Sequence, residues 1–311
     1  MKEDLRDSFI KELQEIKKRN DQLVVLVSDS TSTCRVSPFL LEHPDSVFNV
    51  GIAEQNMIGI AAGLSLGGFI PVTANAACFL LGRSNEQVKV DICYSQTNVK
   101  LVGLNPGFAY GSLGPTHHSL DDISTMLAFG GIDIFVPSDP EETRQITNYA
   151  INKKGPVYIR LDSFSAENIH ADTYSFEPGK SVVLKEGTDI SIIALGTMVH
   201  DVLDAEKELI KMGINAEILS VPSIRPLDPE VIICSLQKTG SAIIFEEHSQ
   251  HGGLGSIVGE IILEHQLNCR IKKTGVPAGQ FAEASPRNDL KEHYNLNKKG
   301  IIKAALDILK R

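Results

Sequence analysis

The chain has 311 residues, of which 42% are hydrophobic and 22% are charged, and its formal net charge is -9. That length and composition are ordinary for a globular protein and leave room for two compact domains. Because no extended basic run is present to neutralise a phosphate backbone, nucleic acid is not an expected partner.

The cysteines and the amino-terminal segment bear on where the protein works. The sequence has five cysteines, no two of them at CxxC spacing and none at zinc-finger spacing from a histidine. Neither a disulfide framework nor a zinc site is therefore expected, and a reducing cytoplasm is the expected location. Residues 1–20 have a helical pattern without an apolar signal core, and no apolar run reaches membrane-spanning length, so no membrane partner is expected.

Short β-branched runs alternate with longer helical patterns along the first half of the chain. Strands are predicted at residues 23–27, 47–50, 70–74, 99–104, 132–136 and 157–161. Helices are predicted between them at residues 53–66, 85–94, 120–128 and 140–152. The last of these helices begins with the capping carboxylate Asp139, then Pro140 and two acids, as helices often do.

The periodicity is lost between residues 163 and 188, and the alternation then resumes. Strands are predicted at residues 190–194, 216–220, 242–246 and 269–274, and helices at 199–212, 229–237, 254–265 and 298–310. The expected fold class is α/β, with two domains that are each a mostly parallel sheet flanked by helices. The domains are expected at residues 1–165 and 188–311, with a linker at 166–187.

The segment with the clearest chemical signal runs from Phe48 to Met57. Here a strand is followed by Gly51 and an apolar helix, so Glu54 falls in the first helical turn at the carboxyl end of a parallel strand. Open α/β sheets bind their ligands at this edge. By position alone, Glu54 would more often merely complement the helix dipole. The helix has almost no polar face, however, so its glutamate should be buried and should need a partner.

Gly51-Ile52-Ala53-Glu54-Gln55-Asn56 resembles the glutamate motif of the transketolase superfamily, which also includes deoxyxylulose-phosphate synthase. The similarity continues through Ala61-Ala62-Gly63-Leu64, Gly68-Phe69-Ile70-Pro71-Val72 and Cys78-Phe79-Leu80, and then through Gly114-Pro115-Thr116-His117-His118, which resembles the GPTH loop of the family. The resemblance implies a thiamine-diphosphate pyrimidine-binding fold, followed by a smaller α/β domain of the transketolase C-terminal type.

The resemblance also implies how thiamine diphosphate would be bound. In the family the glutamate, here Glu54, hydrogen-bonds a ring nitrogen of the cofactor's aminopyrimidine and favours the tautomer that activates the cofactor. Phe79 matches an aromatic residue that stacks on this ring, although a phenylalanine after an apolar strand is more often a core residue. Asp29 and Ile52 match positions beside the cofactor. Burial should raise the pKa of Glu54 against the effect of the helix dipole.

Four further positions match residues that contact the substrate. His117 matches the GPTH histidine, which can exchange protons near neutral pH, and the alternative is a loop histidine with a structural role. Arg6, Thr33 and Arg160 match the residues that hold a sugar phosphate, and paired arginines suit a dianion. For Arg6, an ordinary surface cation is an equally good interpretation.

Some positions depart from the pattern of the family. Asn105 lies where a histidine is expected near the substrate phosphate, and Leu113 replaces an acid that recognises a substrate hydroxyl. The substrate therefore need not be a standard pentose or hexose phosphate. Gly82 and Asn85 replace two aromatic residues, which makes the pocket less aromatic than is typical.

Residues 246–255 resemble the strand-to-glycine-turn segment of the family's C-terminal domain. The histidines and acids of this segment allow metal binding, but a subunit interface is the favoured interpretation. The glycines that precede Leu254 can also seat an anion at the start of a helix.

One expected segment is missing from the sequence. Thiamine-diphosphate enzymes hold the diphosphate through a divalent metal on a glycine-aspartate-glycine segment followed by an asparagine, and no convincing version occurs here. No metal ligand is therefore assigned to this chain. Mg2+ or Ca2+ is expected on a partner, an N-terminal transketolase subunit that carries the diphosphate domain. The expected assembly is a heterotetramer, a dimer of heterodimers.

The expected function is that of a transketolase-type transferase, which moves a two-carbon ketol unit from a ketose phosphate or related ketose to an aldose acceptor. Two alternatives stay open. One is another thiamine-diphosphate enzyme, such as a deoxyxylulose-phosphate synthase or a 2-oxo acid dehydrogenase β subunit. The other is a non-catalytic scaffold subunit, against which the joint presence of Glu54, Phe79 and His117 argues.

Overall fold

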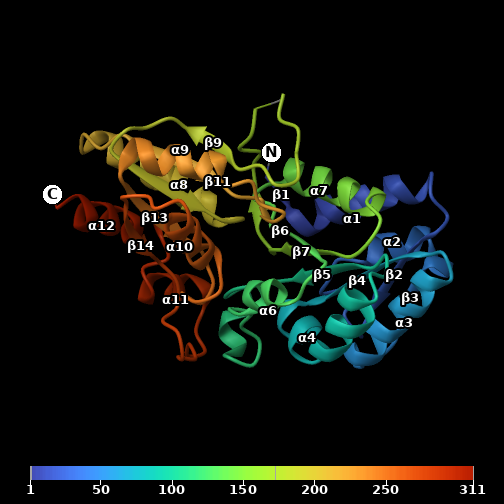
Figure 1. Cartoon of the computed structure of the whole chain (residues 1–311). Coiled ribbons are helices and arrows are strands. Elements are labelled where there is room, and N and C mark those ends of the chain that lie inside the picture. The colour runs from blue at the N-terminus through green and yellow to red at the C-terminus, as the bar shows by residue number, and fades with distance from the viewer. Residues whose placement is uncertain (1, 172, 311) are drawn as a thin grey trace. The chain divides into compact units, whose positions relative to one another are not determined.

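A computed structural model describes the chain over residues 2–171 and 173–310. By its internal contacts the chain divides into two compact units (Figure 1). The first unit comprises residues 1–106 and 125–176, and the second comprises residues 107–124 and 177–311. Within the described ranges, no helix combines the length and the apolar character needed to cross a membrane.

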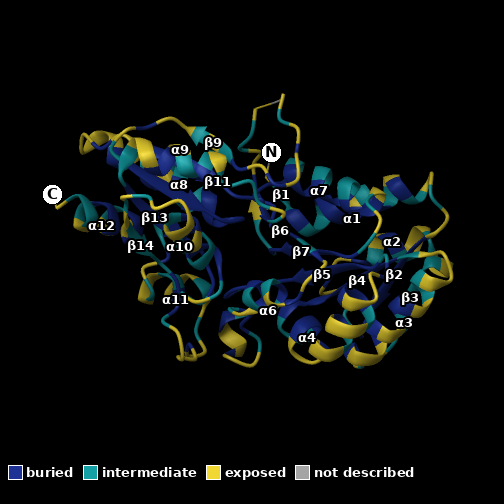
Figure 2. Cartoon of the chain, in the orientation of Figure 1, coloured by how far each residue is buried: buried dark blue, intermediate teal, exposed yellow. Residues whose placement is uncertain are grey.

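The first unit is built on a parallel sheet. Its strands are β2 (Leu23–Val27), β3 (Val47–Asn49), β4 (Ile70–Ala76), β5 (Lys100–Leu104), β6 (Asp133–Phe135) and β7 (Val157–Leu161). They are adjacent in the order β6-β7-β5-β4-β2-β3, and each neighbouring pair is parallel. Every residue of β2, β5 and β7 is buried, as Figure 2 shows for this layer. Parallel strands that are covered on both faces are therefore apolar runs rather than alternating patterns.

Helices cover both faces of this sheet. They are α1 (Leu5–Lys17), α2 (Ser37–Glu42), α3 (Glu54–Leu66), α4 (Ala77–Gly82), α5 (Asn85–Gln87), a π-helix over Val88–Tyr94 and α7 (Pro140–Asn152). Helices α1 and α7 lie together on one face, and α3 and α4 lie on the other (Figure 1). α1 buries Leu5, Phe9, Leu13 and Ile16, which recur at helical spacing, in the core beneath it.

The second unit has a smaller sheet with the strand order β14-β13-β10-β11-β9. All neighbouring pairs are parallel except the pair of β9 with β11. The strands of the unit are β9 (Val182–Lys185), β10 (Ile190–Ala194), β11 (Ala216–Ser220), β12 (Ser223–Arg225), β13 (Ser241–Phe245) and β14 (Arg270–Lys273). Its helices are α8 (Met198–Lys211), α9 (Glu230–Thr239), α10 (Leu254–Glu264), α11 (Arg287–His293) and α12 (Lys298–Leu309). α8 packs with α12, and α9 packs with α10.

The predicted fold class is confirmed, since both units are α/β and mostly parallel. The structure divides the chain in more detail than the sequence predicted. Residues 107–124 group with the second unit, and α6 (Asp122–Ala128) contains the point at which the chain returns to the first. The expected linker also contains regular structure, because β9 joins the second sheet and β8 (Ser165–Ala166) pairs with β1 (Glu3–Asp4).

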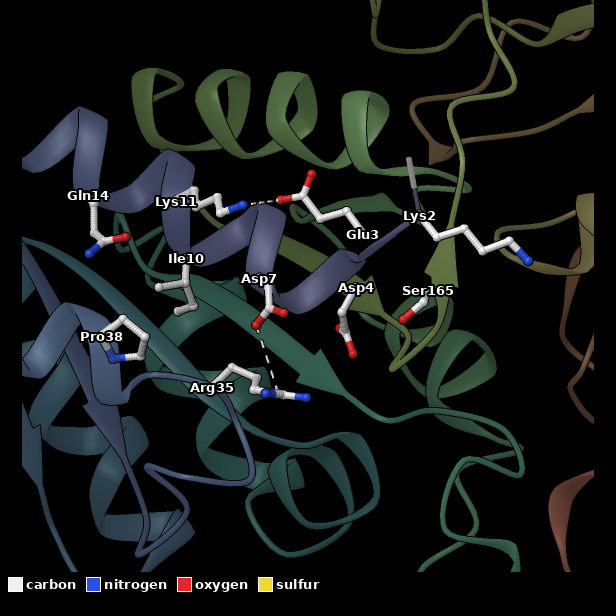
Figure 3. Close-up of a pocket in the computed structure, with 10 residues that line it drawn as sticks. All are labelled: Lys2, Glu3, Asp4, Asp7, Ile10, Lys11, Gln14, Arg35, Pro38 and Ser165. Atoms are coloured by element: carbon white, nitrogen blue, oxygen red, sulfur yellow. Dashed lines mark hydrogen bonds and ion pairs between the residues drawn. The ribbon is translucent and has the colours of Figure 1, made fainter.

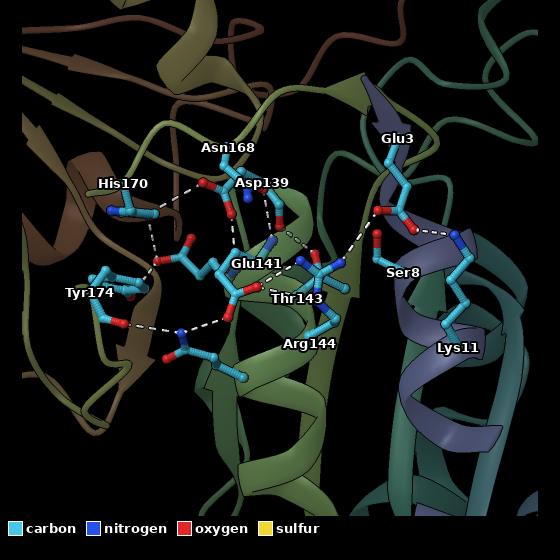
Figure 4. Close-up of polar contacts among 12 residues, drawn as sticks. Glu3, Ser8, Lys11, Asp139, Glu141, Thr143, Arg144, Asn168, His170 and Tyr174 are labelled. Carbon is cyan, nitrogen blue, oxygen red and sulfur yellow. Dashed lines mark hydrogen bonds and ion pairs between the residues drawn. The ribbon is translucent and has the colours of Figure 1, made fainter. Parts of the chain in front are cut away.

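Asn168, His170 and Tyr174 of the expected linker contact the start of α7 (Figure 4). Asp139 caps α7 by accepting from the Glu142 amide at 2.8 Å, and its second oxygen accepts from the Ile169 amide at 2.8 Å. Asn168 accepts from the Glu141 amide at 3.2 Å. Asn168 therefore supplies an acceptor for one of the amides that lack an intrahelical partner at a helix terminus.

The stability of the first unit should depend on the charge of His170. The His170 ring stacks on Tyr174 at 3.9 Å, and its Nε2 lies 3.2 Å from Glu142 Oε1. Burial lowers the pKa of His170, but the hydrogen bond and charge of Glu142 raise it more, so the pKa lies above its ordinary value of 6.5.

Because the folded state binds this proton more tightly, the stabilisation is fully present below pH 6.5 and is lost as the pH rises through the higher folded pKa. We expect the urea midpoint to fall over that interval in the parent chain, and to fall less in His170→Gln. Equal pH slopes for the two proteins would contradict this.

Candidate active site

The position of Glu54 is set by a tight turn after β3. Gly51 adopts a left-handed backbone with φ of 75°, and α3 begins at Glu54. The turn is held by Asn49, whose Oδ1 accepts from the Gly51 amide at 3.0 Å and from the Asp29 amide at 2.9 Å. Asp29 follows β2 and is exposed. The ends of two neighbouring strands therefore fix the start of the helix that carries Glu54.

The Glu54 carboxylate is buried and paired. The residue is 4% exposed, and its Oε1 accepts from Arg83 Nη1 at 2.9 Å and from Asn75 Nδ2 at 3.2 Å. Asn75 is itself buried near the end of β4 and also donates to Ser28 Oγ. The hydrogen-bond partners that a buried carboxylate needs are thus present within the same unit.

Burial raises the pKa of Glu54, but its own amide, the Arg83 guanidinium and the Asn75 amide lower it more, so the pKa lies below its ordinary value. The expected upward shift is therefore wrong for the chain by itself. The burial was foreseen from the apolar helix, whereas the cation beside the carboxylate was not.

An open cavity of about 700 Å³ adjoins this carboxylate, lined by Ile52, Ala53, Glu54, Gln55, Asn56 and Arg83. Ile52 is 74% exposed at its rim. Phe79, in α4, is half-buried, and the Arg83 guanidinium carbon lies 4.1 Å above the centre of its ring. The structure therefore brings Glu54, Ile52 and Phe79 together, with Arg83 between the carboxylate and the aromatic ring.

A second group of predicted residues lies elsewhere in the first unit. Arg6 Nη1 is 3.3 Å from both Asn105 Oδ1 and the Thr33 carbonyl oxygen. Its other nitrogens donate to the Asp4 carboxylate, Nε at 3.0 Å and Nη2 at 2.7 Å. Its side chain is only 13% exposed, so the interpretation as an ordinary surface cation does not describe Arg6.

Strands β5 and β7 determine the positions of Asn105 and Arg160. Asn105 comes directly after β5, has a left-handed φ of 54°, and donates its amide to the Leu161 carbonyl at 3.0 Å. Arg160 is buried in β7, opposite Gly103 of β5. Both residues thus sit at the carboxyl ends of adjacent parallel strands, the edge at which ligands bind.

A cavity of about 540 Å³ lies beside α1 (Figure 3). Two ion pairs lie among its lining residues, with Lys11 2.9 Å from Glu3 and Arg35 3.9 Å from Asp7. None of the predicted site residues lines it, although Asp4, which pairs with Arg6, does.

His117 belongs to the second unit, in the loop after Gly114, whose φ is 79°. Its Nδ1 lies 3.0 Å from the Thr116 hydroxyl, and its ring meets the edge of Tyr110 at 5.9 Å. The neighbouring His118 is buried and its Nε2 contacts the Gly111 carbonyl at 3.0 Å. His118 therefore holds the loop, while the half-buried His117 is presented on it.

Glu247 joins residues 107–124 to the rest of the second unit. Its Oε1 accepts from the Phe108 amide at 2.5 Å and from Arg287 Nε at 3.1 Å, and Glu247 is 2% exposed. Phe108 also stacks on Tyr294 at 5.7 Å. The sequence did not reveal this role because the partners are far apart along the chain.

Removal of this carboxylate should destabilise the second unit. We expect Glu247→Ala to lower the free energy of unfolding by about 2–3 kcal/mol, because a buried amide and the Arg287 cation lose their acceptor. Chemical denaturation would measure the loss. The exposed Glu283 supplies the control, Glu283→Ala, which should change stability by less than about 0.5 kcal/mol. Equal losses in the two variants would contradict the assigned role.

The suggested anion seat before Leu254 is already occupied by the protein. Glu246 Oε2 accepts from the Leu254 amide and Oε1 from the Gly255 amide, both at 2.8 Å. A buried carboxylate thus complements the start of α10, so the idea that these glycines seat an external anion is wrong.

Comparison with known proteins gives two family matches. The transketolase pyrimidine binding domain matches residues 2–164, and the transketolase C-terminal domain matches residues 179–301. The chain belongs to the transketolase family. Transketolases depend on thiamine diphosphate, so membership implies this cofactor.

Similar chains are subunits of transketolases. The chain is 48% identical to a subunit of the apulose-4-phosphate transketolase of Actinobacillus succinogenes, over 94% of each chain. It is 37% identical to a 6-deoxy-6-sulfo-D-fructose transketolase subunit of Clostridium sp., over 99% of this chain and 95% of the relative. A solved split-gene transketolase, described as an inactive beta4 tetramer, is 36% identical, with a TM-score of 0.87 over 99% of this chain and 98% of that one.

Around Glu54 and Asp29, three contacting residues of this transketolase chain were not predicted from the sequence, namely Asn49, Asn75 and Arg83. A signal was present for two of them. Asn75 is a polar residue near the carboxyl end of an apolar strand. Arg83 follows Phe79 by four positions, the spacing at which two helical side chains meet.

Proposed function

We propose that this chain is the C-terminal subunit of a split, thiamine-diphosphate-dependent transketolase. It would transfer a two-carbon ketol unit from a ketose phosphate or related ketose to an aldose acceptor. The observation that carries the proposal is the buried Glu54 carboxylate at the start of α3, which faces an open cavity close to Phe79.

These residues fit the aminopyrimidine ring of the cofactor. A buried carboxylate can hydrogen-bond a ring nitrogen, and a half-buried phenylalanine offers a face for stacking. Asn75 fixes the carboxylate from β4, and Asn49 fixes the turn that precedes it. When bound, the cofactor supplies a carbon nucleophile and an electron sink for the two-carbon unit.

The other predicted residues would form the substrate site. We assign proton exchange at the substrate oxygens to His117, a group that suits neutral pH. Arg160, Arg6, Thr33 and Asn105 would bind the anionic end of the sugar. The names of the two relatives mention a phosphate and a sulfo group. The substrate class is therefore a ketose with an anionic group, and Asn105 and Leu113 leave room for an unusual one.

The proposal includes a partner. No diphosphate-binding segment was found in the sequence, so a second subunit would hold the diphosphate and Mg2+ or Ca2+, in a dimer of heterodimers. The split-gene relative is described as an inactive beta4 tetramer, which supports this dependence. A cytoplasmic location is proposed as well. All five cysteines fall in the described ranges and are thiols, which suits a reducing compartment.

The test is reconstitution. The chain would be purified alone and together with a subunit that carries the glycine-aspartate-glycine segment, each with thiamine diphosphate and Mg2+. Ketose phosphates, a sulfonated ketose and pyruvate would be offered as donors with an aldose phosphate acceptor, and products identified by mass spectrometry. Ketol transfer only by the pair is the expected result.

Two outcomes would overturn the proposal. Ketol transfer by the chain alone would exclude the split site. Activity of the pair with pyruvate and with no ketose would assign the deoxyxylulose-phosphate synthase type of chemistry instead.

A further inference from the structure

Arg83 occupies a particular place beside the proposed cofactor seat. It directly follows α4, lines the cavity of about 700 Å³, and has a side chain that is 47% exposed. Its guanidinium makes two contacts at once. Nη1 donates to Glu54 Oε1 at 2.9 Å, and the guanidinium carbon lies 4.1 Å above the Phe79 ring.

These two contacts are of the same kinds that an aminopyrimidine would make. A guanidinium is a planar, nitrogen-rich group that stacks on aromatic faces and donates to carboxylates. At 4.1 Å from the ring, it leaves no space for a second planar group on the same face of Phe79. One hydrogen-bonding position of Glu54 is filled in the same way.

We propose that Arg83 is an internal substitute for the aminopyrimidine, which covers Phe79 and pairs with Glu54 until the cofactor displaces it. The proposal rests on the proposed function, because it takes Glu54 and Phe79 as the seat of that ring. Arg83 is a positioning residue in this scheme, and it acts on the cofactor only through Glu54 and Phe79.

The surroundings of Arg83 allow such a displacement. Its side chain is half-exposed, so its ion pair and its cation–π contact are weak and the arginine can move into solvent. Asn75 is different, because it is buried and bonded to Ser28 as well as to Glu54. Departure of Arg83 would therefore leave the carboxylate in place.

Displacement would also change the carboxylate itself. Arg83 is among the groups that hold the pKa of Glu54 below its ordinary value, whereas burial alone raises that pKa. A carboxylate that shares a proton with a ring nitrogen works best when the two proton affinities are similar. Arrival of the ring would thus remove one of the groups that hold the pKa of Glu54 below its ordinary value.

The test is a binding titration with the full chain and the uncharged hydroxymethyl aminopyrimidine half of the cofactor. The neutral probe avoids any effect of removing a cation from the neighbourhood of a charged ligand. Binding would be followed by NMR in the parent chain, Arg83→Gln and Arg35→Gln. Arg35 is a matched control, since it is 51% exposed, lies in the same unit and lines the other cavity (Figure 3).

We expect Arg83→Gln to bind the probe about fivefold more tightly, equivalent to about 1 kcal/mol, and Arg35→Gln to bind like the parent. An unchanged or lower affinity of Arg83→Gln would overturn the proposal. Phe79→Ala separates this failure from failure of the proposed function. If the parent binds the probe and Phe79→Ala weakens binding, Glu54 and Phe79 do bind the ring. The affinity of Arg83→Gln then tests only the role of Arg83.

If the probe does not bind, or binds equally well without the Phe79 ring, the seat itself is wrong. That outcome overturns the proposed function of the site and the role of Arg83 with it. Far-UV circular dichroism of each variant would verify that the fold is retained.

Discussion

Glu54→Gln should lower turnover of the assembled enzyme by about 10³-fold while leaving the fold intact. Glutamine has nearly the same shape, and its carbonyl oxygen can still accept from Asn75 Nδ2. It cannot share a proton with a ring nitrogen, which is the step assigned to Glu54. Steady-state turnover with the partner subunit and saturating cofactor would measure the loss, and thermal unfolding would show that the fold is retained.

A matched control is available in the same unit. Glu86 is an exposed glutamate of α5, and Glu86→Gln removes one carboxylate from the same unit without touching the proposed seat. It should retain turnover within about twofold, since surface substitutions change little. Turnover of Glu54→Gln close to that of Glu86→Gln would exclude the proposed role of Glu54.

Glu142→Ala should lower the free energy of unfolding by about 3–5 kcal/mol. The carboxylate is fully buried, and Oε2 accepts from the Ser138 amide at 2.7 Å and from its hydroxyl at 2.6 Å. Oε1 accepts from the Tyr174 hydroxyl at 2.6 Å and pairs with His170. Alanine would leave several buried donors without an acceptor, which is costlier than the loss of a surface contact.

The neighbouring Glu141 supplies the comparison (Figure 4). It is 38% exposed and pairs with Arg144 at 2.6 Å on the outer side of α7. Glu141→Ala should therefore cost less than about 1 kcal/mol. Urea unfolding of both variants would measure the difference, and similar losses would show that the buried network contributes little. Faster proteolysis next to Tyr174, which loses its bond to Glu142, would be a further expected result in Glu142→Ala alone.

The strands and long helices of this chain could be predicted because burial imposes a pattern on them. β2 and β7 are covered on both faces, so each is an unbroken run of largely apolar residues in the sequence. α1 has one covered face and so repeats its apolar residues at helical spacing. Some short elements show no such pattern, although α6, with seven residues, was predicted within residues 120–128. α4 and α11 have six and seven residues, less than two full turns, and were not predicted.

The candidate site was predicted in part. The motif around Gly51 and Glu54 is contiguous in sequence, so its position at a strand-to-helix turn could be inferred. The charge environment could not. The partner of Glu54 is Arg83, 29 positions away, and it lowers a pKa that burial alone would raise. Residues 107–124 group with the second unit, and one of the contacts that join them to it is that of Phe108 with Glu247, 139 positions away.

The sequence by itself determined the α/β class, the transketolase family and the location of Glu54, because local periodicity and contiguous motifs record which faces of each element are buried. Only the tertiary structure decided which side chains meet. It paired Glu54 with Arg83, placed the Glu246 carboxylate at the start of α10, and joined Asn168 and Ile169 to the start of α7. The physical reason is that the partner of a buried polar group is chosen by the packing of distant segments, which leaves no periodic trace in the chain.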